Sequence, residues 1–266
     1  MAEIKGPSPD AEPTTDVWTR LRTFTPARVG LGRTGASLPT QALLDFELAH
    51  ARARDAVHAT FDAEALARNL RESGFDNPMI VASQAQSRMD YLLRPDLGRT
   101  LDAASRQQLQ AQSQQISGPN LVVVIADGLS AIAPARHALP LLNQLRSDAA
   151  ALPGDHWKNV TVVVANYARV ALGDEIGQIL RAQAVVVLIG ERPGLSSPDS
   201  LGIYLTWAPR IGRTDAERNC ISNVRPDGLP YREAATRLAW LLSEARRLQL
   251  SGVALKDDSE GAAFLP

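Results

Sequence analysis

The chain has 266 residues, of which 45% are hydrophobic, so it is long enough and apolar enough to bury a sizeable core. Its 28 basic and 29 acidic side chains give a net charge of −1, which excludes the strong positive field of a general nucleic-acid or anionic-lipid binder. The apolar runs are too short for a membrane span and no signal-peptide pattern is present, so we expect a cytoplasmic protein. A single cysteine excludes an internal disulfide, and four scattered histidines lack metal-ligand spacing, so no metal site is expected.

The first third of the sequence predicts a tail followed by helices. Residues 1–15 contain three prolines and little apolar pattern, which is typical of a loose tail. A short helix is predicted around Trp18, followed by a glycine-rich loop at 28–40. Apolar residues at intervals of three and four then predict an amphipathic helix: Leu43, Phe46, Ala49, Ala53 and Val57.

From about residue 118 the sequence alternates between apolar strands and helices. Continuous Val, Ile and Leu runs separated by helices are typical of parallel strands covered on both faces, with right-handed crossovers between them. The fold class is therefore predicted to be α/β, a doubly wound, mostly parallel, Rossmann-like sheet with a smaller, mainly helical N-terminal region. The predicted strands are 121–127, 159–166 and 184–190, and the helices between them are 130–150 and 173–182.

Weaker signals extend this pattern on both sides. Short apolar segments at 78–83 and 202–209 predict further strands. Further helices are predicted at 63–73, ending at Gly74, at 101–116, and at 231–252 with Gly252 at its end. The domain boundaries that follow are a tail at 1–15, a helical region at 16–117, the Rossmann-like domain at 118–257 and a tail at 258–266.

Polar residues follow each of the three central strands. In an open parallel sheet, ligands bind outside the carboxyl ends of the strands, so these residues should meet in one crevice. Backbone N–H groups in such a crevice favour an anionic or carbonyl-rich ligand. The three strand exits are Asp127-Gly128, Asn166-Tyr167 and Gly190-Glu191.

Each candidate residue also has a simpler interpretation. Asp127 is suited to cap a helix beside a turn glycine, and Glu191 could pair with Arg192 on the surface. Cys220 fits an ordinary half-buried thiol better than a nucleophile. The hydrolase pattern G-x-S-x-G surrounds no serine, and the dinucleotide pattern G-x-G-x-x-G follows no strand.

Several motifs resemble the small subunit of ethanolamine ammonia-lyase. They are "RVGLGRTGASLPTQALLDFELAHARARDAV" (28–57), "YLLRPDLGR" (91–99), "IADGLSA" (125–131), "ALGDEIG" (171–177), the long run from "IGERPGLSSPDSLG" to "RPDGLPY" (189–231) and "LSGVALKD" (250–257). The resemblance implies a carbon–nitrogen lyase that uses adenosylcobalamin and acts only with a large catalytic barrel subunit. That larger partner would bind ethanolamine, and a radical rearrangement would release acetaldehyde and ammonia.

The resemblance also implies which residues of this chain contact the cofactor. They are Val170, Glu191 and Cys220, whereas catalytic residues are expected on the large subunit. The chain departs from the family where a glycine is expected before Val170, because it has the sequence Asn166-Tyr167-Ala168-Arg169. No D-x-H-x-x-G motif is present, so the resemblance implies that cobalt keeps its dimethylbenzimidazole ligand.

Other interpretations remain open at this point. A stand-alone nucleotide-binding regulator of doubly wound fold would use Asp127 and Glu191 to hold a ribose, and a purely structural subunit would not touch the cofactor. We expect residues 28–57 to bind the large subunit, because Arg52 and Arg54 lie outside the apolar stripe of the helix. The assembly is expected in the cytoplasm, either free or enclosed in a bacterial microcompartment, with no nucleic acid or membrane as a partner.

Overall fold

The computed structural model describes residues 17–25, 27–33, 36–118, 120–149 and 159–259. The chain divides into two compact units, the first ending at Arg52 and the second beginning at Ala53. The predicted tail at 1–15, and all but the first two residues of the predicted tail at 258–266, lie outside the described residues.

The first unit contains helix α1 (Val17–Arg22) and most of helix α2 (Thr40–His58), with a loop between them of which residues 23–25, 27–33 and 36–39 are described. Gly30 has a φ of +56°, and a Cβ atom there would lie 2.3 Å from the Trp18 ring, so only glycine fits at this point of the loop. The expected helix after Thr40 is confirmed, but its apolar stripe is not fully buried. Large apolar side chains that remain exposed in this unit are Trp18, Leu21, Phe24, Leu38, Leu43, Leu44, Phe46 and Leu48.

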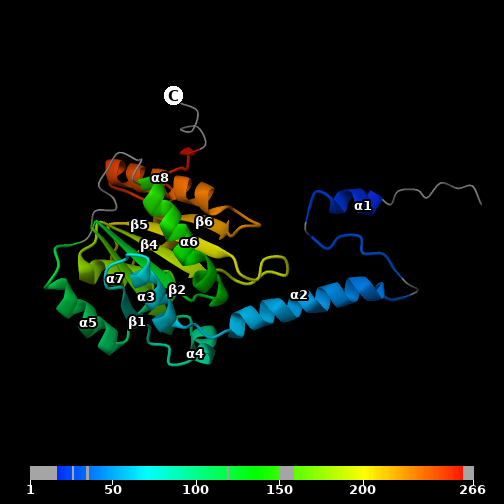
Figure 1. The fold of residues 1–266 in the computed structure, drawn as a ribbon, viewed down its shortest axis with the longest axis horizontal. Coiled ribbons are helices and arrows are strands. Elements are labelled where there is room, and N and C mark those ends of the chain that lie inside the picture. The colour runs from blue at the N-terminus through cyan, green and yellow to red at the C-terminus, as the bar shows by residue number, and fades with distance from the viewer. Residues whose placement is uncertain (1–16, 26, 34–35, 119, 150–158, 260–266) are drawn as a thin grey trace, which may run out of the picture. The chain divides into compact units, whose positions relative to one another are not determined.

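The second unit is built on a six-stranded sheet with the order β1-β3-β2-β4-β5-β6 (Figure 1). The first four strands in this order are parallel, whereas β5 and β6 are antiparallel to their neighbours. The fold class predicted from the sequence is thereby confirmed. The strands are β1 (Met79–Ala82), β2 (Leu121–Ala126), β3 (Val160–Asn166), β4 (Ala184–Gly190), β5 (Leu201–Trp207) and β6 (Arg218–Val224).

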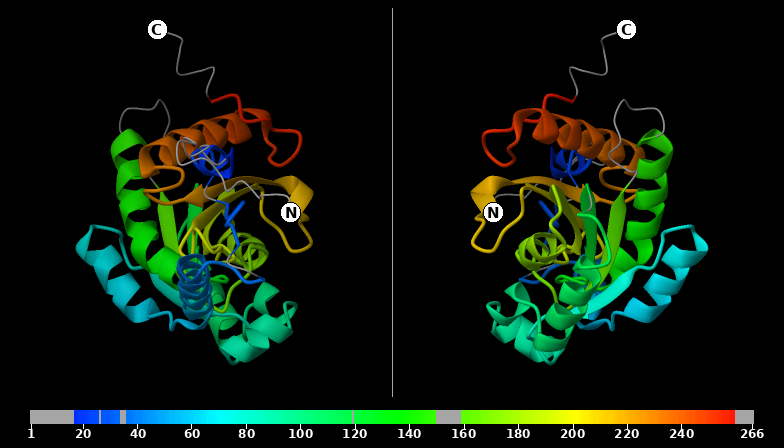
Figure 2. Two further views of the ribbon diagram at one scale, coloured as in Figure 1. Left: turned by 90° about the vertical axis from the view of Figure 1, so that its right-hand side faces the viewer. Right: turned by 90° about the vertical axis from the view of Figure 1, so that its left-hand side faces the viewer.

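Helices cover both faces of this sheet (Figure 2). Alternate residues of β2 face opposite sides, so Val123 belongs to one core cluster and Val124 to the other. The first cluster contains residues of α3 (Ala63–Glu72), α6 (Ile132–Ala149) and α8 (Tyr231–Leu248), and the second contains residues of α5 (Ala103–Ser113) and α7 (Leu172–Leu180). Short helices complete the unit: α4 (Arg88–Leu93), η1 (Leu97–Arg99) and η2 (Asp215–Glu217).

Some elements differ from the sequence analysis. Helix α8 ends at Leu248 with Gln249 in the left-handed conformation, whereas Gly252, at φ +87°, lies in the following loop. Helix α4 and strand β6 were not predicted.

Among the described residues, none of the helices combines the length and apolar character needed to cross a membrane.

Candidate functional site

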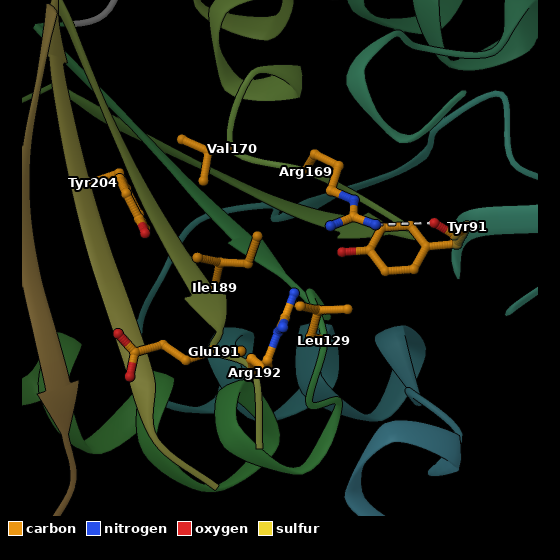
Figure 3. Close-up of a pocket in the computed structure, with 9 residues that line it drawn as sticks. Tyr91, Leu129, Arg169, Val170, Ile189, Glu191, Arg192 and Tyr204 are labelled. Carbon is orange, nitrogen blue, oxygen red and sulfur yellow. Dashed lines mark hydrogen bonds between the residues drawn. The ribbon is translucent and has the colours of Figure 1, made fainter. Parts of the chain in front are cut away.

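A pocket of about 420 Å³ lies at the carboxyl ends of β2, β3 and β4 (Figure 3). The predicted meeting of the three strand exits is confirmed in part. Gly190 and Glu191 line the pocket, whereas the other two exits reach it through the residues that follow them, Leu129 and Arg169. The N–H of Leu129, after β2, donates to the carbonyl of Gly190 at 2.9 Å, which fixes the exit of β2 against that of β4. The pocket is lined by Tyr91, Leu129, Arg169, Val170, Ile189, Gly190, Glu191, Arg192 and Tyr204.

Asp127 connects the exits of β2 and β3 beneath the pocket. Its Oδ1 accepts hydrogen bonds from the backbone N–H groups of Gly128 and Ala168, both at 3.0 Å, and the residue is only 2% exposed. It is therefore not the helix cap suggested by the sequence, since α6 begins at Ile132. It is also too buried to hold a ribose, so the nucleotide-binding alternative loses one of its two expected contacts. Burial raises the pKa of Asp127 to about 6, although the hydrogen bonds from backbone N–H groups and the nearby Arg88 both act to lower it.

Two glycines allow the strand exits to approach closely. A Cβ atom on Gly190 would lie 2.0 Å from the carbonyl oxygen of Ser130, and one on Gly128 would lie 2.2 Å from the carbonyl oxygen of Gly190. Gly128 also has a φ of +57°. Glycine at these positions is required by the approach of the protein's own backbone.

Glu191 lies half-buried at the edge of the pocket, and its carboxylate points toward the Tyr204 side (Figure 3). Its Oε2 accepts a hydrogen bond from the N–H of Asn223 at 3.1 Å. Gly202 leaves room for the side chain, because a Cβ there would lie 3.1 Å from Oε1. Within the described part of the chain, Oε1 accepts no hydrogen bond and Arg192 forms no ion pair with Glu191. The surface ion pair considered in the sequence analysis is therefore absent from this part of the molecule.

Val170 lies on the opposite wall of the pocket, in the loop between β3 and α7. Its carbonyl accepts from the N–H of Gly173 at 3.0 Å, whereas its own N–H has no hydrogen-bond partner among the residues described. In the stretch 166–169, where the resemblance led us to expect a glycine, Tyr167 adopts a φ of +52°. This left-handed conformation is one that glycine adopts without strain, and here a tyrosine adopts it.

Cys220 lies on β6 directly opposite Tyr204 on β5, so it borders the pocket without lining it. The thiol is exposed, not half-buried as expected, and its Sγ lies 3.3 Å from Oγ of Ser222. Burial, with the nearby Cys220 and Glu191, raises the pKa of Tyr204 above its usual value. The Tyr204 hydroxyl is therefore protonated near neutral pH and can donate a hydrogen bond.

The loop after β4 is held by contacts on its far side. The hydroxyl of Ser130 donates to the carbonyl of Pro198 at 3.0 Å. Asp199 accepts from Arg136 at 3.0 Å and lies 3.3 Å from Nε2 of the buried His137, whose other ring nitrogen lies 2.7 Å from the Tyr231 hydroxyl. These contacts fix the segment that presents Glu191 and Arg192.

Sequence reasoning missed the residues that complete the pocket walls. Tyr91 is fully buried on α4, and the guanidinium groups of Arg88 and Arg169 lie 4.9 and 4.3 Å from the centre of its ring. Tyr204, which lines the pocket, and Asn223, whose N–H binds Glu191, were also missed. The motif "YLLRPDLGR" was the only signal near Tyr91, and nothing in the local sequence placed it beside the strand exits. Among the described residues, no group of three or more His, Cys, Asp or Glu side chains could hold a metal ion.

The fold and the pocket together define an α/β protein with a pocket at the carboxyl ends of parallel strands, the position where such folds bind ligands. Comparison with known proteins makes this more specific. Residues 15–256 match the family described as "Ethanolamine ammonia-lyase light chain (EutC)". The chain is 55% identical over 257 residues to the ethanolamine ammonia-lyase small subunit of Pseudomonas aeruginosa (strain UCBPP-PA14), covering 96% of this chain and 92% of that protein.

Two further relatives agree with this match. The ethanolamine ammonia-lyase small subunits of Pseudomonas putida (strain W619) and Pseudomonas fluorescens (strain Pf0-1) are each 55% identical over 244 residues, covering 91% of this chain and 88% of those proteins. The chain belongs to the ethanolamine ammonia-lyase small-subunit family. It is thus a subunit of a carbon–nitrogen lyase, and the stand-alone regulator is excluded.

Proposed function

We propose that this chain forms one wall of an adenosylcobalamin site that a large catalytic subunit completes. The observation that supports it is the arrangement of the three expected contact residues around one pocket. Val170 and Glu191 line it from two strand exits, and Cys220 borders it opposite Tyr204. Residues far apart in the sequence therefore converge at the carboxyl ends of the parallel strands.

The chemistry of the pocket fits the periphery of a corrinoid. The cofactor's rim carries neutral amides, which both donate and accept hydrogen bonds. Glu191 offers a carboxylate oxygen without a partner in the described part of the chain, and Val170 offers a backbone N–H. Ile189 and Leu129 add apolar surface for the ring edge or the benzimidazole. These groups match an amide-rich ligand with apolar faces.

The size of the pocket supports a shared site. At about 420 Å³ the pocket is far too small for a whole corrinoid. The rest of the cofactor must then contact another surface, which we assign to the large subunit. The exposed apolar side chains of α1 and α2 provide a surface that such a partner would cover, with α1 extending the expected surface at 28–57 toward the N-terminus.

In this account the chain binds and orients the cofactor and excludes water from its lower side. When bound, adenosylcobalamin supplies the radical that begins the reaction of ethanolamine. Ethanolamine itself would be bound by the large subunit. The assembled enzyme would work in the cytoplasm or within a bacterial microcompartment.

Replacing Glu191 by glutamine tests this proposal. The change keeps the size of the side chain but removes its charge, and a charge-assisted hydrogen bond is worth roughly 1.5–3 kcal/mol net. Cobalamin affinity of the assembled complex should fall by about one to two powers of ten. Turnover of the saturated enzyme should change much less, because the radical steps would take place on the opposite corrin face. The same substitution at the exposed Glu233 of α8 is the matched control. Unchanged affinity in Glu191→Gln would reject the cofactor role of this residue.

A further inference from the structure

A second cavity, of about 460 Å³, shares three lining residues with the pocket: Leu129, Arg169 and Arg192. Among the described residues that line either cavity, Glu191 supplies the only carboxylate. Figure 3 shows this carboxylate on the Tyr204 side, whereas the Arg192 side chain extends toward Leu129 and the side where Arg169 lies. The surface shared by the two cavities is therefore cationic.

Arg169 is held in place before any ligand binds. Its guanidinium stacks on the Tyr91 ring at 4.3 Å, and its Nη2 donates to the carbonyl of Tyr91 at 3.1 Å. Its backbone N–H donates to the carbonyl of Gly98 at 2.8 Å. Nε is buried without a hydrogen-bond partner in the described part of the chain, and the free end of the guanidinium faces the pocket (Figure 3). Such a group is a preorganised donor.

Arg192 is exposed and has neither a hydrogen-bond nor an ion-pair partner within the described ranges. Two guanidinium groups that border one space repel each other, and an anion between them would remove that repulsion. Phosphate groups suit this geometry, because guanidinium binds them through paired charge-assisted hydrogen bonds.

We propose that Arg169 and Arg192 bind the phosphodiester of the cofactor's nucleotide tail. This inference rests on the proposed function. The phosphodiester is the anionic group of the tail, whereas the rim amides are neutral. Glu191 would repel an anion and Arg192 would attract one, so the tail would lie on the arginine side of the pocket and the rim amides on the Glu191 side.

The test compares two ligands on the assembled complex. Cyanocobalamin contains the tail, and cyanocobinamide lacks the phosphodiester, ribose and base. Loss of Arg192 in Arg192→Met should weaken cyanocobalamin binding about tenfold. Cyanocobinamide binding should be unchanged or slightly tighter, since that ligand lacks the anion and gains from the removal of a repelling charge. Arg169→Lys, which keeps the charge but loses the paired geometry, should show a smaller loss in the same direction.

Arg210→Met is the matched control. Arg210 is an exposed arginine in the loop after β5, at the opposite end of the sheet, because Trp207 pairs with Ala184 at the start of β4. It should leave both affinities unchanged.

The result for Arg192→Met decides the inference, since this exposed side chain is not needed for folding. Equal weakening of both ligands, with poorer co-purification of the large subunit, would show that Arg192 binds an acidic group of the partner and would overturn the inference. An unchanged preference for cyanocobalamin would also overturn it. In either case, the expected fall in cobalamin affinity of Glu191→Gln would leave the proposed function intact. If neither Glu191→Gln nor Arg192→Met changed cobalamin affinity, both proposals would be rejected.

Discussion

At the residue scale, Asp127 shows how one carboxylate can hold two strand exits together. It was placed correctly at the end of β2, but its role depends on Ala168, which is 41 residues away in the sequence. Because the desolvated carboxylate is costly when ionised, its burial affects stability as well as geometry.

This burial predicts a pH effect on stability. The pKa of Asp127 is raised from 3.8 to about 6, so the folded chain binds a proton more tightly than the unfolded chain. The contribution of the protonated group is fully present below about pH 4 and is lost as pH rises to about 6. Relative to Asp127→Asn, the free energy of unfolding of the wild type should therefore fall by on the order of 3 kcal/mol over this range. Urea unfolding of both proteins from pH 4 to pH 7 would measure it.

Asparagine keeps an acceptor for the two backbone N–H groups, so the comparison isolates the charge. A difference between the two proteins that stays constant with pH, or grows in favour of the wild type, would contradict the assigned cause.

The other site residues differ in how well the sequence could place them. Glu191 was predictable as a pocket residue because it directly follows an apolar strand. In parallel sheets, ligand-binding crevices lie at the carboxyl ends of the strands. The hydrogen bond that orients its carboxylate was not predictable, because it comes from Asn223 on a strand with no apolar signal. Tyr91 and Arg169 come together only through tertiary packing.

At the element scale, burial on both faces decided which strands could be predicted. β2 and β4 are buried at every position, and such strands are continuous apolar runs in the sequence. β6 has the sequence "RNCISNV" and was missed. Its first residue, Arg218, is buried, and Asp174 on α7 pairs with it there at 2.6 Å. Nothing near Arg218 in the sequence indicates that Asp174 is its partner.

Helix α2 gives a prediction about assembly. Arg52 and Arg54 are exposed, and neither has an ion-pair partner in the part of the chain that the structure describes. If this helix binds the large subunit, the double replacement Arg52→Glu and Arg54→Glu should weaken assembly. Each glutamate would repel the acidic group of the partner that the arginine attracts. Co-purification of the large subunit at increasing salt would measure the effect.

The matched control reverses two exposed arginines on α3, Arg68 and Arg71. This control should leave co-purification unchanged. Equal recovery of the large subunit with the α2 variant and with wild type would count against a partner surface on this helix.

At the scale of the whole molecule, the chain has a well-formed pocket but no complete corrinoid site. Its sheet brings Val170 and Glu191 to one opening, with Cys220 at the border, and the first unit carries exposed apolar side chains. A small subunit of this kind would contribute cofactor affinity only after assembly. Neither subunit alone should then bind cobalamin as tightly as the pair.

The most direct test of this account is a cobalamin titration of three samples: this chain alone, the large subunit alone and the assembled pair. We predict tight binding by the assembled pair, with binding at least about tenfold weaker in either separate subunit, which corresponds to about 1.4 kcal/mol or more. Binding by the large subunit alone with the same affinity as the pair would contradict the claim that this chain forms part of the cobalamin site.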